Sequence, residues 1–261
     1  MRTKVLCCMP IFHLALALAL LFASASLQAS VITYNLTTAE NANSGNLNPY
    51  GVWSFLAGTT ILPYNIIPPT GSCLSAYAGL SSDYAVGNVT GNCIPAFAVA
   101  SGTGPGSPPD FLKGDVVVHS WDPSNGASNG QAFVTWTAPT KGTITIAGLI
   151  WYAQSAQTRS NDYILTLDGN TLASGAVAYN STNGYNRAHP LAFSGGGTLT
   201  VNVGDEMALE ILKSQGQPYG SIDGIDLTVT ETTATPEPSS LILLGTGFFG
   251  LAGAIRRKIN L

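Results

Sequence analysis

The chain has 261 residues and a formal net charge of −4, and only 9% of its residues are charged. Thirteen acidic and five basic residues fall between positions 30 and 235, which gives this part a net charge of −8. Such a segment has no basic patch to neutralise phosphates, so nucleic acid is excluded as an expected partner. It would also repel acidic polysaccharides unless a divalent cation bridged them.

The first 29 residues have the features of a secretory signal peptide. Arg2 and Lys4 precede the apolar stretch LALALALLFA, and the small-residue segment SASLQAS follows. These are the charged region, the apolar region and the cleavage region of such a peptide. We expect cleavage after Ala25 or Ala29, because the apolar core is short for a retained membrane helix, which is the alternative.

Residues 30–230 predict one all-β ectodomain. Short alternating or β-branched runs recur, each bounded by Gly, Pro, Asn or Asp, as strands are. The runs are SVITYNL, GVWSFLAG, DVVVHSW, AFVTWT, GTITIAGLIWYA, DYILTLDG, GTLTVNV, EMALEILK and GIDLTVT. A DGN turn at 168–170 predicts a hairpin with the following run TLASGAV. We therefore expect an antiparallel sandwich or barrel.

The first part of this region is poorer in strands than the rest. The tract SGTGPGSPPD at 101–110 is either a domain linker or a long surface loop. One domain is favoured, because residues 31–110 alone have too few predicted strands to enclose a core. Residues 231–238 then form a polar, proline-bearing linker to the tail.

Two cysteines, Cys73 and Cys93, remain after removal of the signal peptide. A disulfide between them is expected in an exported protein. Closing that loop would contribute about 3 kcal/mol. The alternatives are two buried thiols or half of a metal site, and the sequence has no nearby His or CxxC to complete such a site.

The ectodomain has few residues suited to catalysis. Only His119 and His189 remain after processing, and neither a GxSxG nor an HExxH motif occurs. We expect His119 to be a hydrogen-bonded residue at a strand end, and the protein not to be an enzyme. A carboxylate pair for glycoside hydrolysis is the chemistry hardest to exclude, because its spacing is spatial.

The acidic residues also have simpler interpretations. Candidates for a carboxylate pair are Asp205, Glu206, Glu210, Asp223 and Asp226. Glu206 and Glu210 alternate with the apolar residues Met207, Leu209 and Ile211, so on a strand they would face solvent. Asp168, Asp205 and Asp223, expected in loops, could hold a structural Ca²⁺, and no other cofactor is expected.

Aromatic side chains suggest binding instead, because sugar rings stack on aromatic faces. Trp136 and Trp151 lie in apolar strands and are expected in the core. Residues predicted in loops are better ligand candidates, and they are Trp121, Tyr179, Tyr185 and Arg187.

The C-terminal tail predicts a short membrane helix. Residues 239–255 carry no charge, and Arg256, Arg257 and Lys258 follow at once. At 1.5 Å per residue this run is about 25 Å long, at the lower limit for a spanning helix. The basic residues would keep 256–261 cytoplasmic and place the ectodomain outside. A buried terminal helix is the less favoured alternative.

Pro236, Glu237 and Pro238, the apolar run and the basic cluster together resemble the PEP-CTERM protein-sorting signal of Gram-negative bacteria. This resemblance implies an exosortase as processing partner, with cleavage near the Pro-Glu-Pro motif. It also implies that inner-membrane anchoring is transient and that the protein then reaches the cell surface or the extracellular matrix. Such proteins are associated with exopolysaccharide and biofilms.

The segment NPYGVWSFLAG at 48–58 and the later runs VTWTAPTKGTITIAGLIW, LTVNVGDEMALEIL and GSIDGIDLTVT are similar to a recurrent exported module. Their order resembles jelly-roll sandwiches of the galactose-binding or carbohydrate-binding kind, whose ligands often lie on loops at one end. We therefore expect a non-catalytic surface or matrix protein that binds polysaccharide. A purely structural matrix protein and a secreted glycan-active hydrolase remain as alternatives.

Overall fold

This computed structural model describes residues 29–66, 74, 77, 79–86, 93–104, 110–126, 129–154, 159–178, 185–233 and 247. Residues 31–232 form one compact unit. The predicted signal peptide except Ala29, and the predicted membrane span except Gly247, lie outside the described residues. Within the described part, no helix is both long and apolar enough to span a bilayer.

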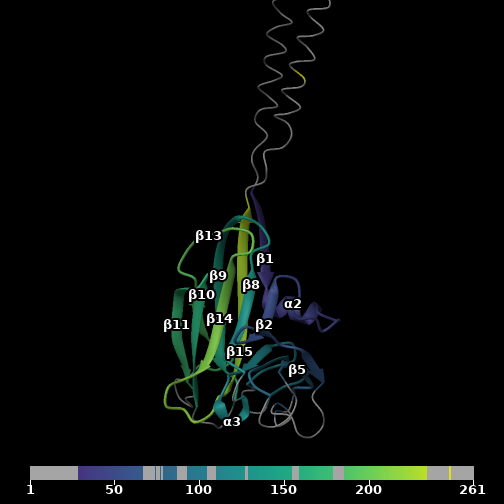
Figure 1. Cartoon of the computed structure of the whole chain (residues 1–261), viewed down its shortest axis with the longest axis vertical. Helices are drawn as coiled ribbons and strands as arrows, with labels where there is room; N and C mark the ends of the chain where they lie inside the picture. Colours follow the sequence, from purple (N-terminus) through teal and green to yellow (C-terminus); the bar gives the residue numbers. More distant parts are fainter. Residues whose placement is uncertain are drawn as a thin grey trace, which may run out of the picture. The chain divides into compact units, whose positions relative to one another are not determined.

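Two antiparallel sheets make up the described part of the ectodomain (Figure 1). In the described residues the larger sheet has nine strands, seven of which follow one another in a continuous path. Their order is β12 (Leu191–Ser194), β9 (Gly142–Tyr152), β15 (Ile222–Thr233), β7 (Val116–His119), β6 (Ala96–Val99), β5 (Ser82–Ala85) and β4 (Tyr64–Ile66). In addition, β1 (Ser30–Asn35) pairs with β15, and β13 (Leu199–Val201) pairs with β9.

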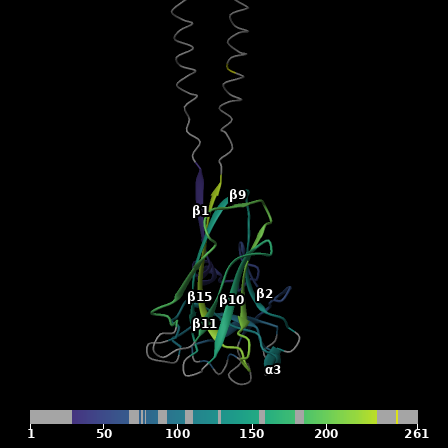
Figure 2. The ribbon, with the colours of Figure 1, turned by 90° about the vertical axis from the view of Figure 1, so that its left-hand side faces the viewer.

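The smaller sheet has six strands in the described part. Their order is β11 (Asn170–Ala178), β10 (Ser160–Leu167), β14 (Glu206–Lys213), β8 (Ala132–Thr137), β2 (Trp53–Ala57) and β3 (Thr60–Ile61). Two short helices, α2 (Leu36–Ala42) and α3 (Pro123–Gly126), lie outside the sheets. Figure 2 shows the ribbon from the side, with β10 and β11 toward the viewer. The predicted all-β, antiparallel sandwich is confirmed.

The predicted hairpin at 168–170 is also confirmed. Leu167 of β10 pairs with Asn170 of β11, which leaves Asp168 and Gly169 as a two-residue turn. Both have positive φ, 48° and 76°. A two-residue turn with positive φ at both positions matches the right-handed twist of the flanking strands, and an Asp-Gly pair adopts it at low cost.

The main core lies between the sheets and is built from alternate residues of each strand. In β14, Met207, Leu209 and Ile211 are buried while Glu206 is exposed, as their alternation predicts. Trp136 of β8 is fully buried among them, as expected. Burying one such large apolar side chain contributes about 1.5–3 kcal/mol, so this alternation accounts for much of the stability of the sandwich.

A second, smaller core covers the outer face of the larger sheet. It includes Phe111, Val117, Trp151 and Ile222, and the strand neighbours of Val117 and Trp151 belong to the main core. The indole Nε1 of Trp151 donates to the backbone carbonyl of Asp110 at 2.7 Å. The loop that contains Phe111 therefore packs on the sheet, and the expected burial of Trp151 is confirmed.

Candidate functional site

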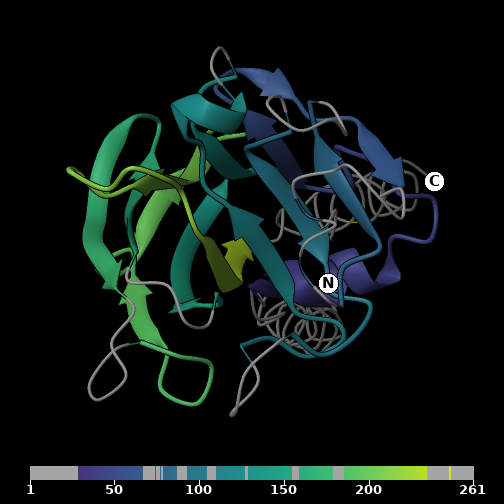
Figure 3. The ribbon, with the colours of Figure 1, turned by 90° about the horizontal axis from the view of Figure 1, so that it is seen from below.

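Several strands end together at one end of the sandwich, which we call the loop end (Figure 3). The strand register places these strand ends side by side. His119 at the end of β7 pairs with Ile222 at the start of β15. Tyr152 at the end of β9 pairs with the next residue of β15, Asp223. Asn161 near the start of β10 pairs with Lys213 at the end of β14. The helix α3 lies at this end, opposite the start of β1 and the end of β15 (Figure 1).

A buried polar network joins the two sheets at the loop end. Asn161 of β10 donates through Nδ2 to Asp223 Oδ2 at 2.7 Å, and to the carbonyl of Ser221 at 3.1 Å. The Ser120 hydroxyl donates to Asn161 Oδ1 at 2.8 Å and accepts from the Ser221 N–H at 3.1 Å. Burial raises the pKa of Asp223 well above its usual value, and the bond from Asn161 opposes this only in part. The network therefore holds a carboxyl group for which the neutral form is favoured.

Next to this network, Arg159 and Tyr219 form a partly exposed pair. Arg159 Nη1 donates to the carbonyl of Gly220 at 2.7 Å, and its guanidinium carbon lies 4.9 Å from the centroid of the Tyr219 ring. The N–H of Gly220 donates to Asp122 Oδ2 at 3.0 Å, which ties this loop to the segment before α3. Tyr219 remains 43% exposed. Its ring is therefore held by a cation and still faces solvent.

The structure brings two of the predicted ligand residues to the loop end. Trp121 follows Ser120 directly and is half-buried, and Tyr185 is 37% exposed. The Tyr185 carbonyl accepts from the N–H of Tyr152 at 3.1 Å, which fixes its backbone beside the end of β9. Tyr179 lies outside the described residues.

Arg187, the fourth predicted ligand residue, forms an ion pair with Asp115. Its Nε donates to Asp115 Oδ2 at 2.6 Å and its Nη2 donates to Asp115 Oδ1 at 3.0 Å. Its guanidinium carbon lies 6.0 Å from the Trp151 ring, on the outer face of the larger sheet. The hydrogen bonds to Asp115 raise the pKa of Arg187. This side chain ties a loop to the second core, and its partner lies 72 residues away in the chain, where no local pattern indicates it.

The two histidines lie in different environments. His119 ends β7, is almost fully buried, and has Nδ1 2.8 Å from the Ser120 carbonyl. Burial lowers its pKa, so the neutral imidazole is favoured. His189 is exposed in a turn, where its N–H donates to the Asn186 carbonyl at 2.9 Å.

The loop aspartates considered for calcium have separate local roles. Asp168 Oδ1 accepts from the Glu206 N–H and Asp205 Oδ2 accepts from the Asn202 N–H, each at 2.8 Å. The expectation that Asp223 lies in a loop is wrong, because it belongs to β15 and is fully buried. Across the described ranges, no three His, Cys, Asp or Glu side chains are placed to hold a metal ion.

Of the two cysteines expected to pair, Cys93 is fully buried and Cys73 lies outside the described residues. The disulfide between them stays a prediction.

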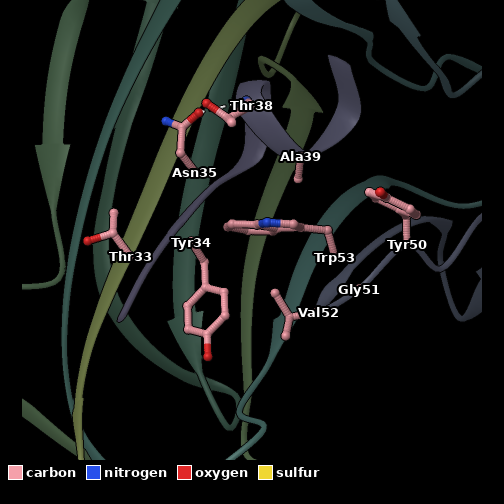
Figure 4. A pocket seen from close by; sticks show the side chains of 9 residues that line it. All are labelled: Thr33, Tyr34, Asn35, Thr38, Ala39, Tyr50, Gly51, Val52 and Trp53. Atoms are coloured by element: carbon pink, nitrogen blue, oxygen red, sulfur yellow. Dashed lines mark hydrogen bonds between the residues drawn. The ribbon is translucent and has the colours of Figure 1, made fainter. Parts of the chain in front are cut away.

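A separate pocket of about 470 Å³ opens beside β1 and α2, and we call it the aromatic pocket (Figure 4). Its lining residues are Thr33, Tyr34, Asn35, Thr38, Ala39, Tyr50, Gly51, Val52 and Trp53. Three of the nine carry aromatic rings and none is charged. Sequence reasoning missed it, because its two lining segments meet only through tertiary packing.

Comparison with known proteins identifies the tail. Residues 234–258 match the PEP-CTERM protein-sorting motif, and this range contains the Pro236–Pro238 motif and the basic residues 256–258. The chain therefore carries an exosortase sorting motif at its C-terminus. No curated protein matches the sequence.

Among solved structures, the chain is similar to an adhesin domain and to carbohydrate-binding modules. The K3 cleaved adhesin domain of Lys-gingipain from Porphyromonas gingivalis is 17% identical, with 45% of this chain and 73% of that chain covered and a TM-score of 0.27. The C-terminal CBM6 of a Zobellia galactanivorans laminarinase is 10% identical, with coverages of 69% and 99% and a TM-score of 0.23. The CBM22-1–GH10 modules of Clostridium thermocellum xylanase 10B are 9% identical, with coverages of 71% and 27% and a TM-score of 0.29.

Proposed function

We propose that this protein is an exported, non-catalytic surface or matrix protein that binds neutral polysaccharide. The observation that supports export and surface placement is the sorting motif at 234–258. We further infer a cleaved signal peptide at 1–29, a transient inner-membrane anchor at 239–255 and a cytoplasmic tail at 256–261. Final placement is the cell surface or extracellular matrix of a Gram-negative bacterium, in association with exopolysaccharide.

Binding is assigned to the loop end of a jelly-roll type module. Trp121, Tyr185 and Tyr219 all lie there, and the two tyrosines are exposed. Aromatic faces bind the apolar faces of sugar rings, and a net charge of −8 between residues 30 and 235 favours neutral over acidic glycans. The buried Ser120–Asn161–Asp223 network supports these loops from below.

Processing is tested by the intact mass of the protein recovered from an exosortase-positive host. We expect the polypeptide to begin after Ala25 or Ala29 and to end near Pro238. A variant with Pro236, Glu237 and Pro238 all changed to alanine should keep its tail. Recovery of the unchanged chain with its full tail would contradict the proposal.

Glycan binding is tested by retardation of the exported protein in native gels that contain a panel of neutral polysaccharides. We expect Tyr219→Ala and Trp121→Ala each to weaken binding by about 3- to 10-fold, the equivalent of one aromatic contact. Val203→Ala is the matched control, since Val203 is 69% exposed and precedes β14 at the opposite end of the sandwich.

Other results would favour the alternatives. Absence of retardation by every neutral glycan would overturn binding and favour a purely structural matrix role. Release of sugar products from a glycan, lost when one loop-end carboxylate is changed to its amide, would make the protein a hydrolase.

A further inference from the structure

We propose that the aromatic pocket is a second binding site, which takes one neutral sugar ring of a glycan. Its volume of about 470 Å³ falls within the range of small-molecule sites, about 300–1,000 Å³. The half-buried rings of Tyr34 and Tyr50 supply its accessible aromatic surface, and the Trp53 indole, which is only 2% exposed, lies between them in the view of Figure 4 and backs the pocket. Such rings suit the apolar faces of a pyranose.

The polar groups of the pocket select a neutral, hydroxylated ligand. Thr38 is an exposed lining residue whose hydroxyl can both donate and accept, whereas the Thr33 hydroxyl points away from the rings in Figure 4. None of the nine lining residues is charged, so a charged ligand would lose water without gaining a partner. A neutral sugar ring satisfies both features.

The walls of the pocket are fixed before any ligand binds. The Tyr34 hydroxyl donates to Glu231 Oε2 at 3.1 Å, and Glu231 Oε1 accepts from Thr140 at 2.6 Å. Asn35 caps α2 by accepting from the Thr38 N–H at 2.8 Å. Trp53 is only 2% exposed and is held by pairing in β2. A preformed wall lowers the entropy lost on binding.

The aromatic pocket is well separated from the loop end. Tyr34 contacts β15 at Glu231, whereas the loop-end network contacts the same strand at Asp223. Eight residues of extended strand span roughly 26 Å. Two sites this far apart let one molecule hold two glycan chains. This consequence rests on the proposed function, because it requires glycan binding at the loop end as well as in the aromatic pocket.

The test follows the methyl groups of Ala39 and Val52, which line the pocket, by NMR of the exported protein with labelled alanine and valine. The probes are the methyl glycosides of glucose, galactose and mannose, with glucuronate as the charged analogue. We expect at least one neutral glycoside to shift both methyl signals in a saturable way, and glucuronate to bind at least about 10-fold more weakly, an energy difference of about 1.4 kcal/mol. Tyr50→Ala should abolish the shifts and Tyr219→Ala should leave them unchanged.

Several outcomes would overturn the proposal. These are no shift with any neutral glycoside, equal binding of glucuronate, shifts unaffected by Tyr50→Ala, or shifts produced by cyclohexane but by no sugar. A separate assay measures whether one protein molecule bridges two glycan chains. The wild-type protein should aggregate glycan-coated beads, and either Tyr50→Ala or Tyr219→Ala should abolish this aggregation. If Tyr219→Ala weakens gel retardation while the methyl signals never shift, the proposed function stands and only the second site fails.

Discussion

Changing Gly224 to alanine is expected to destabilise the sandwich strongly, by about 3 kcal/mol, at the upper end of what overpacking costs. Gly224 of β15 pairs with Trp151 of β9, and a Cβ at Gly224 would overlap the Trp151 ring. That ring is almost fully buried and its Nε1 is bonded to the Asp110 carbonyl. Because β15 lies between β9 and β7, its backbone has little freedom to move away.

Denaturant-induced unfolding of the exported protein measures this effect. Gly45→Ala is the matched control, because Gly45 is exposed and an added Cβ there would meet only the Leu47 side chain, at 3.4 Å or more. It should change the free energy of unfolding by less than about 0.5 kcal/mol. A loss below about 1 kcal/mol for Gly224→Ala would show that the Trp151 ring can turn aside without cost.

The second large effect concerns Asp83, and it depends on pH. Asp83 of β5 is 1% exposed, and its two carboxyl oxygens have no hydrogen-bond partner within the described part of the chain. Burial raises its pKa to about 7 from the usual 3.8, with Asn65 on the paired strand β4 opposing the shift. The folded protein therefore keeps this proton up to about pH 7, whereas the unfolded chain loses it near pH 4.

The sign of the pH dependence follows from this difference. The contribution of Asp83 to stability is complete below about pH 4 and is lost as pH rises toward 7. One pH unit corresponds to about 1.4 kcal/mol, so the total loss is at most about 4 kcal/mol. Asp83→Asn cannot ionise, so it should match the wild type near pH 4 and exceed its stability at pH 8.

Unfolding free energies measured from pH 4 to pH 8 test this prediction. Glu206→Gln, which alters an exposed carboxylate in β14, should keep the wild-type profile. If the free energy of unfolding of Asp83→Asn falls with pH as steeply as that of the wild type, another group causes the pH dependence of stability. If it is less stable at every pH, the ionised carboxylate has a favourable partner.

Several of the strands that sequence reasoning predicted have side chains that alternate between core and solvent. The runs that gave β8, β9, β10 and β14 have such a pattern, and their core faces are buried as it requires. The strands β4 and β5 were missed because they are short and carry the polar residues Asn65 and Asp83. The helix α2 was missed because its seven residues have no apolar period; its Asn35 cap and the burial of Leu36 become visible only in the fold.

The candidate site was predicted in part for a similar reason. Loop aromatics can be recognised from sequence, and Trp121 and Tyr185 do lie at the loop end. Tyr219 is also a loop aromatic, flanked by proline and glycine, and the same signal could have found it. The Asp115 partner of Arg187 and the aromatic pocket depend on contacts distant in sequence, which no local pattern records.

The place of β15 in the larger sheet has a consequence for how the ectodomain is made. This strand is the last of the sandwich in the chain, yet it separates β9 from β7 and also pairs with β1. A polypeptide that emerges with its N-terminus first therefore cannot join these three strands until residues 222–233 have followed. Such long-range pairing is slow and leaves strand edges open to aggregation. The segment that completes the fold is thus the one that leads directly into the sorting motif at 234–258.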